Sequence, residues 1–246
     1  MAPKPVVFVL HGAWHGPVYF EPVKSKLEAL GYTMVCPQQP STGGIPPTTT
    51  LYDDAAHVRA ELEQLVEQGE DVVLVLHSYG GMVGTQAAAG LGKAERMKRG
   101  QKGGIVRLFY ACAFLLPLGK DLCGGLGGRL PPWIKEEANG SCNATMPEHV
   151  FYHDLPAEEQ KHWASKLKHH STIAQNTPLT QVAYTDIPVT YLYCEDDQAL
   201  PLAVQEMMVK QSGLTDVQEL RCGAGHSPFL SQPDVFVASI IKSITA

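Results

Sequence analysis

One stretch of ten residues most limits what this chain can fold into: Val72-Val73-Leu74-Val75-Leu76-His77-Ser78-Tyr79-Gly80-Gly81. Its first five residues are apolar, and three of them are β-branched. The run is short for a helix, so it predicts a buried strand. The small residues from Met82 to Ala89 predict a helix after the glycines. A strand, a serine on a sharp turn and a helix form the layout of a nucleophile elbow, in which a helix N-terminus faces the hydroxyl.

The match to this layout has one departure. The usual pattern is Gly-x-Ser-x-Gly, and this chain has Leu76 where the first glycine stands. A small residue there relieves crowding between strand and helix, so we expect a slightly wider turn around Ser78. A Ser-x-Gly segment after a strand also occurs in plain glycine-containing loops. The rest of the chain must decide between an elbow and such a loop.

Strand and helix patterns alternate along most of the chain. Strands are predicted at 6–10, 33–36, 72–76, 105–113, 189–194 and 217–220, and helices at 19–30, 53–68, 82–89, 156–169, 202–211 and 233–244. This alternation predicts an α/β fold, with a mostly parallel central sheet and helices on both faces. The rhythm stops over residues 116–186, which we expect to form a helical lid inserted into one core made of residues 1–115 and 187–246.

Two later loops hold the partners that an acyl-transfer serine needs. Glu195-Asp196-Asp197 and Gly225-His226-Ser227 each follow a predicted strand, so Ser78, an acid and a base occur in the order typical of this fold. Both loops lie at carboxyl ends of strands, where open α/β sheets place their ligands. Each loop alone also fits an ordinary turn or helix cap. The joint order favours a Ser–His–Asp site.

The expected oxyanion donors are two backbone N–H groups. Ala13 lies in the loop after the first strand, and Tyr79 follows Ser78 directly. Backbone N–H groups at such positions stabilise the negative oxygen of a tetrahedral intermediate.

The chain resembles the α/β-hydrolase fold over essentially its whole length, and more narrowly the plant methylesterases and hydroxynitrile lyases and similar small fungal hydrolases. The resemblance is carried by His11-Gly12-Ala13-Trp14-His15-Gly16, His77-Ser78-Tyr79-Gly80-Gly81, Cys194-Glu195-Asp196-Asp197-Gln198-Ala199-Leu200-Pro201 and Gly225-His226-Ser227-Pro228-Phe229-Leu230. It implies Asp197 rather than Asp196 as the acid, because the family's acid stands four residues before the proline. It also implies the oxyanion donors Ala13 and Tyr79. Cyanohydrin cleavage is disfavoured, because the lyases carry threonine and lysine where this chain has Gly12 and Ser227.

The lid, residues 116–186, holds further candidates for substrate contacts. We expect an apolar pocket lined by Trp133, Phe151 and Trp163 together with Trp14 and His15, and packing of the lid on the core is an equal alternative for the lid aromatics. The five lid histidines are His149, His153, His162, His169 and His170. They lack the tight ligand spacing of a zinc site, so we interpret them as a solvated helix face and lid residues. No metal and no cofactor is expected.

Charge and hydropathy exclude several other classes of function. The formal net charge of −6, from 19 basic and 25 acidic residues, lacks the basic surplus of a nucleic-acid-binding protein. We interpret the one basic cluster, Lys93 to Lys102, as a solvated loop. No run approaches the roughly 18 apolar residues of a membrane span, and the N-terminus lacks a secretory signal. We therefore expect a cytoplasmic protein with free thiols and a small-molecule substrate; the oligomeric state is left open, a homodimer included.

These patterns predict a serine hydrolase that cleaves a small, partly hydrophobic carboxylic ester, thioester or lactone through an acyl-enzyme. Ser78 is expected to attack, His226 to accept its proton and Asp197 to orient the imidazole. Two alternatives stay open. One is a lyase, isomerase or cyclase of secondary metabolism that uses the same site, because fold does not fix function. The other is a ligand-sensing binding protein on this fold, against which an intact triad argues.

Overall fold

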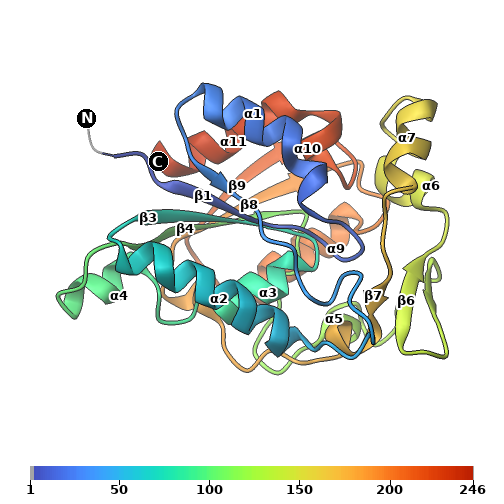
Figure 1. Cartoon of the computed structure of the whole chain (residues 1–246), viewed down its shortest axis with the longest axis horizontal. Helices are drawn as coiled ribbons and strands as arrows, with labels where there is room; N and C mark the ends of the chain where they lie inside the picture. The colour runs from blue at the N-terminus through green and yellow to red at the C-terminus, as the bar shows by residue number, and fades with distance from the viewer. Residues whose placement is uncertain (1–2, 246) are drawn as a thin grey trace.

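The computed structural model describes residues 3–245, and its centre is a six-stranded sheet (Figure 1). The strand order is β2-β1-β3-β4-β8-β9, and every neighbouring pair is parallel. The strands are β1 (Val6–Leu10), β2 (Met34–Val35), β3 (Asp71–His77), β4 (Gly104–Ala111), β8 (Val189–Cys194) and β9 (Val217–Cys222). Val72 to Leu76 are fully buried, as the central position of β3 requires. The predicted parallel α/β sheet is confirmed.

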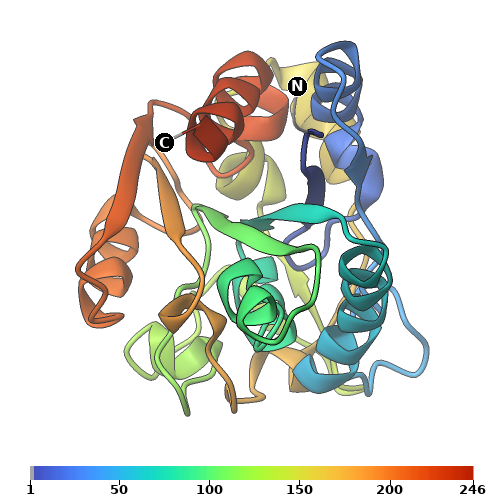
Figure 2. The same cartoon turned by 90° about the vertical axis from the view of Figure 1, so that its left-hand side faces the viewer.

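Helices cover both faces of this sheet, which Figure 2 shows almost along the strands. The helices α1 (Glu21–Ala29) and α11 (Pro233–Thr245) pack together on one face, and α2 (Leu51–Glu67) and α3 (Gly80–Ala87) on the other. The other core helices are η1 (Pro17–Phe20), α4 (Lys93–Lys98), α9 (Leu202–Gln211) and α10 (Pro228–Ser231), whereas η2 (Ala183–Thr185) belongs to the segment 116–186. No helix of residues 3–245 is both long and apolar enough to cross a membrane.

The helix α2 begins two residues earlier than the sequence predicts because of its cap. The Thr50 side chain accepts a hydrogen bond from the backbone N–H of Asp53, and the Asp53 carboxylate accepts one from the N–H of Thr50. This reciprocal capping box satisfies two N–H groups that the first turn leaves unpaired. The cap therefore fixes where the helix starts, and it brings Asp54 to the buried side of the first turn.

The basic cluster Lys93 to Lys102 is not the solvated loop that its composition predicts. Lys93–Lys98 form α4, and Arg96 on that helix is buried. Its guanidinium donates to the carbonyls of Val66 and Gly103 and to the Glu67 carboxylate. A planar guanidinium with five donors can satisfy several carbonyls at once, which stabilises its burial.

Residues 116–186 combine short helices with a small sheet. Their elements are α5 (Leu122–Gly125), β5 (Ile134–Glu136), β6 (Ser141–Ala144), α6 (Pro147–Tyr152), α7 (Ala157–Ala164), β7 (His170–Ser171), α8 (Thr172–Gln175) and η2. The strands form an antiparallel sheet in the order β5-β6-β7. The sequence predicts a helical segment and a single helix over 156–169. Strands of two to four residues show no readable alternation, so the sheet could not be foreseen.

The segment 116–186 is tied to loops at one end of the central sheet, where Figure 1 shows β6, β7, α6 and α7 together. The N–H of Ser171 donates to the Ser41 carbonyl, and the N–H of Lys168 donates to the Trp14 carbonyl. The His170 imidazole, fully buried, lies 3.0 Å from the Ser41 hydroxyl. His170 is therefore not on the solvated face that the sequence suggests.

Candidate active site

Ser78 lies on a sharp turn between β3 and α3. Its φ of +52° is in the left-handed region, which non-glycine residues adopt at a cost and often at functional sites. Gly80 permits this turn, because a Cβ there would lie 2.5 Å from the Leu10 carbonyl oxygen of β1. The strand, the strained serine and the helix start therefore have the geometry of a nucleophile elbow.

Leu76 is accommodated from the helix side rather than by a wider turn. A Cβ added at Gly84, on α3, would collide with Leu76 Cδ2, and both residues are buried. The glycine that usually stands two residues before the serine is thus replaced by a glycine on the facing helix. Strand and helix keep their close approach.

We expect Gly84→Ala to lower the free energy of unfolding by about 1–3 kcal/mol, since it overpacks the contact with Leu76. Urea unfolding of Gly84→Ala, Leu76→Ala and the double variant measures this coupling as a double-mutant cycle. The double variant should lose less free energy of unfolding than the sum of the two single losses. Additive losses would contradict the proposed pairing of the two positions.

His226 and Asp197 form a direct buried pair. His226 Nδ1 lies 2.7 Å from Asp197 Oδ2, and both side chains are almost fully buried. The other carboxylate oxygen, Oδ1, accepts hydrogen bonds of 2.8 Å from the N–H groups of Ala199 and Leu200. A carboxylate so held accepts a hydrogen bond from the Nδ1–H group and leaves Nε2 as the basic nitrogen of the imidazole.

The neighbouring Asp196 lies elsewhere. Its Oδ2 is 3.0 Å from His153 Nε2 on the segment 116–186, and its side chain is 61% exposed. The next residue of that segment, Asp154, accepts a hydrogen bond from the N–H of Gly225. The two aspartates thus have different partners, and only Asp197 contacts His226.

The loop that holds Ala13 is fixed by two buried contacts. His15 Nδ1 lies 2.8 Å from the Ala13 carbonyl, and Trp14 Nε1 donates to the carbonyl of Cys142 on β6. Trp14 adopts a φ of +65°. The contact of His15 with the Ala13 carbonyl therefore fixes the orientation of this strained loop beside Ser78.

Tyr79 is held through its hydroxyl. That hydroxyl donates to Asp54 Oδ2 over 2.9 Å, and Asp54 Oδ1 accepts from the N–H of Ser41 over 2.8 Å. Burial raises the pKa of Asp54 and of Tyr79. This buried network connects the first turn of α2 with the residue after Ser78.

One pocket of about 340 Å³, its open side included, meets the residues above. Its lining consists of Ala13, Trp14, Ser78, Tyr79, Phe114, Leu122, Leu126, Pro131, Trp133, Ile134, Ala199, Leu200 and His226. Ser78 and His226 therefore face one space, although no hydrogen bond joins Ser78 Oγ to His226 within residues 3–245. Catalytic hydrogen bonds are often made only when substrate is bound. Apart from His226, none of the lining side chains is ionisable at neutral pH.

Three of the five predicted pocket residues are not part of this lining. Trp14 and Trp133 line the pocket, whereas His15, Phe151 and Trp163 do not. His15 faces the Tyr152 hydroxyl at 2.9 Å, and Trp163 packs on Tyr19. The structure therefore brings Trp14 and Trp133 to this pocket and leaves His15, Phe151 and Trp163 outside its lining.

A family model described as "Alpha/beta hydrolase family" matches residues 6–239. The chain belongs to the alpha/beta hydrolase family. Its relatives include alpha/beta hydrolase nvfD of Aspergillus novofumigatus, which is 36% identical over 96% of this chain and 95% of its own length. Salicylic acid-binding protein 2 of Nicotiana tabacum is 26% identical over 96% of this chain and 95% of its own length.

Solved structures agree with this alpha/beta hydrolase fold. A pyrethroid hydrolase from Sphingobium faniae JZ-2 superimposes with a TM-score of 0.79 and covers 98% of both chains, at 22% sequence identity. The predicted resemblance to the alpha/beta hydrolases, with plant methylesterase-like and fungal relatives, is confirmed by these comparisons.

Several lining residues of this alpha/beta hydrolase were not predicted from its sequence. The largest group, Leu122, Leu126, Pro131 and Ile134, comes from the glycine-rich and proline-rich part of the segment 116–186. The spacing of Leu122 and Leu126 fits one helical turn and was the available signal. The surrounding glycines hid it, because they favour a loop.

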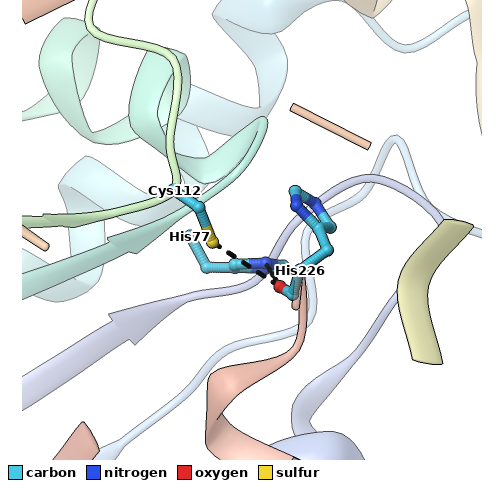
Figure 3. Close-up of side chains that lie close together, drawn as sticks. All are labelled: His77, Cys112 and His226. Carbon is cyan, nitrogen blue, oxygen red and sulfur yellow. Dashed lines mark hydrogen bonds between the residues drawn. The ribbon is translucent and has the colours of Figure 1, made fainter. Parts of the chain in front are cut away.

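Among the residues that the structure describes, one cluster of potential metal ligands borders the pocket at His226. Ligand atoms of His77, Cys112 and His226 lie within 4.8 Å of one another (Figure 3). The cluster is poorly suited to a metal, because His226 Nδ1 faces Asp197 and His77 Nε2 faces the His226 carbonyl. Burial also raises the pKa of Cys112 to about 12, which disfavours the thiolate that metals bind.

Three buried histidines should make the stability of this alpha/beta hydrolase fall in mild acid. Burial lowers the pKa of His11 to about 4 and the pKa values of His15 and His170 to about 3. Below the unfolded-state pKa of about 6.5, the unfolded chain binds protons that the folded chain refuses. We therefore expect the three to lower the free energy of unfolding by about 3 kcal/mol in total between pH 6.5 and 5.5.

Urea unfolding at pH 7.5, 6.5 and 5.5 measures this loss together with that of buried His77, whose pKa is also lowered by burial. In His170→Gln the fall between pH 6.5 and 5.5 should be smaller by about 1 kcal/mol, because one titrating group is gone. An equal fall in this variant and in the parent protein would show that His170 is not held neutral.

Proposed function

We propose that this chain is a serine hydrolase that cleaves a small, neutral and largely apolar carboxylic ester, thioester or lactone through an acyl-enzyme. The observation that carries the proposal is the meeting of a strained Ser78 and the His226–Asp197 pair at one apolar pocket. Membership of the alpha/beta hydrolase family supports hydrolysis as the reaction class.

In the first step, Ser78 Oγ attacks the substrate carbonyl carbon while His226 Nε2 takes the hydroxyl proton. Asp197 stabilises the imidazolium that forms, and the carbonyl oxygen becomes an oxyanion. The N–H groups of Ala13 and Tyr79, two residues of the pocket lining, are the proposed donors to that oxyanion. The tetrahedral intermediate then expels the alcohol or thiol, which receives the proton from His226.

In the second step, His226 takes a proton from a water molecule, and the resulting hydroxide attacks the acyl carbon of the acyl-enzyme. Ser78 leaves as an alkoxide and regains its proton from His226. The carboxylic acid is released, and the site returns to its starting state. No cofactor enters either step.

A fluorophosphonate probe tests the acyl-enzyme mechanism directly. An activated serine attacks the phosphorus and displaces fluoride, so the chain should gain one phosphonyl group on the peptide that contains Ser78. Intact-mass and peptide mass spectrometry after a few minutes of exposure measure this. Absence of labelling, or labelling of a different residue, would contradict the proposal. It would favour a non-hydrolytic use of the pocket or a binding function instead.

We further propose that residues 116–186 act as a lid that sets substrate choice. Trp133 from this segment lies in the pocket wall, with its ring 5.7 Å from that of Trp14. An aromatic wall without charged side chains, made by two rings at 65° to each other, favours neutral acyl or alcohol groups with aromatic or aliphatic character.

Trp133→Ala should raise KM for a bulky aromatic ester about tenfold, the loss of about 1.4 kcal/mol of binding, with a smaller change in kcat. Labelling of Ser78 by a small phosphonate should change much less. Trp163→Ala is the matched control: it removes a half-buried tryptophan of the same segment that does not line the pocket. Equal changes in substrate ranking for the two variants would contradict the assignment of Trp133 to the lid's pocket wall.

A further inference from the structure

His77 connects the two halves of the candidate site through a backbone atom. This residue ends β3, directly before Ser78, and its side chain is fully buried. Its Nε2 lies 2.8 Å from the backbone carbonyl oxygen of His226, and Cys112 Sγ lies 3.6 Å from the same oxygen. Figure 3 shows both side chains directed at this one carbonyl.

The carbonyl partner fixes which nitrogen of His77 carries the proton. A carbonyl oxygen only accepts hydrogen bonds, so Nε2 must be the protonated nitrogen and Nδ1 the bare one. Nδ1 is buried and has no hydrogen-bond partner among residues 3–245. No acceptor among these residues faces Nδ1 to stabilise a second proton there. The ring is therefore a neutral donor.

The surroundings of His77 also keep it neutral. Its ring centroid lies 4.7 Å from that of His226, 5.9 Å from that of His15 and 4.9 Å from that of Phe229. Burial lowers the pKa of His77 well below its usual value, and the nearby His226 lowers it further. When His226 carries a proton during turnover, a neutral His77 adds no repulsion at this short distance.

We propose that His77 is a positioning residue, whose Nε2–H holds the His226 backbone and so fixes the base relative to the serine that follows His77. This inference rests on the proposed hydrolase function. Asp197 holds only the imidazole of His226, whereas the backbone of His226 lies in an irregular loop between β9 and α10. A donor from the residue next to Ser78 supplies the missing anchor.

Two substitutions separate the hydrogen bond from the space that the ring fills. His77→Gln keeps an N–H donor at about the reach of Nε2, and His77→Met fills similar volume without a donor. We expect His77→Met to lower kcat about 10–100-fold with little change in KM, as misplacement of a catalytic group does. His77→Gln should recover most of that loss. Phosphonate labelling of Ser78 should slow in parallel with kcat.

Thr190→Val is the control for loss of a side-chain hydrogen bond as such. Thr190 is fully buried on β8 and donates to Gln218 on β9, near the other end of these strands. Its kcat should stay within about twofold of the parent value. A purely structural role for His77 predicts that melting temperature and kcat fall together in every variant, including His77→Gln.

An NMR measurement on the unmodified protein does not depend on activity. In protein with ¹⁵N-labelled histidine, with the His77 signals assigned from His77→Gln, His77 should carry its proton on Nε2 and stay neutral from pH 5.5 to 8.5. A proton on Nδ1, or titration of His77 near pH 6.5, would overturn the proposal. This measurement tests the proposal even if His77→Met does not fold. Failure of the parent protein to label would count against the hydrolase function and not against the role of His77.

Two further results would also overturn the inference. The first is a kcat for His77→Gln as low as that for His77→Met, or a His77→Met variant as active as the parent protein. The second is one equivalent of Zn²⁺ bound by the parent protein and lost in His77→Gln, which would make the cluster a metal site.

Discussion

Replacing Ser78 by alanine is expected to lower kcat by several orders of magnitude and to abolish phosphonate labelling. The residual rate should come from the oxyanion donors and substrate binding, roughly 10³-fold above the reaction in water. Alanine fits the same backbone, because it tolerates a φ of +52° no worse than serine. The melting temperature should therefore change little. Initial rates with a neutral aryl ester and a melting curve measure both.

Ser243→Ala is the control for the serine substitution. Ser243 is also buried, but it lies on α11 and donates to the Ile240 carbonyl, away from the pocket. Its kcat should equal that of the parent protein. Should Ser78→Ala keep more than about a tenth of the parent activity, Ser78 is not the nucleophile.

Replacing Asp197 by asparagine is expected to lower kcat on the order of 10⁴-fold with little change in stability. The reason lies in the contacts of the two carboxylate oxygens. Oδ1 accepts from the N–H groups of Ala199 and Leu200, so the oxygen of the new amide must stay there. The amide NH₂ group then faces His226 Nδ1 and donates to it. The imidazole proton moves to Nε2, which can no longer accept a proton from Ser78.

Asp196→Asn is the matched control, since it makes the same chemical change one residue earlier. Asp196 is exposed and contacts His153 rather than His226. It should cost less than about tenfold in kcat. A reversed order of the two losses would assign the acid to Asp196 and would require the His226–Asp197 contact to break in solution.

The sequence predicted those elements whose pattern is set by burial alone. The strand Val189–Cys194 and the helix Leu202–Gln211 have the predicted ends, because one is a fully buried run rich in β-branched and aromatic residues and the other starts after Pro201. The order of Ser78, Asp197 and His226 after β3, β8 and β9 was also readable, because parallel strands place their carboxyl ends at one edge.

The features that the sequence did not predict depend on contacts between distant segments. Arg96 is buried because the Val66 carbonyl, 30 residues away, and the Glu67 carboxylate accept hydrogen bonds from its guanidinium. His170 is buried because it faces Ser41, 129 residues away. A charged or polar residue in a hydrophilic stretch carries no local sign of such a partner, so composition alone assigns it to the surface.

The contact between Leu76 and Gly84 has a consequence for how such chains vary. The space at this point of the elbow admits one side chain, from the strand or from the helix. We expect the two positions to covary among homologues: glycine at the strand position frees the helix position to carry a side chain, and a large strand residue requires glycine on the helix. A search pattern that demands glycine before the serine therefore misses chains that hold their glycine one helical turn inside α3.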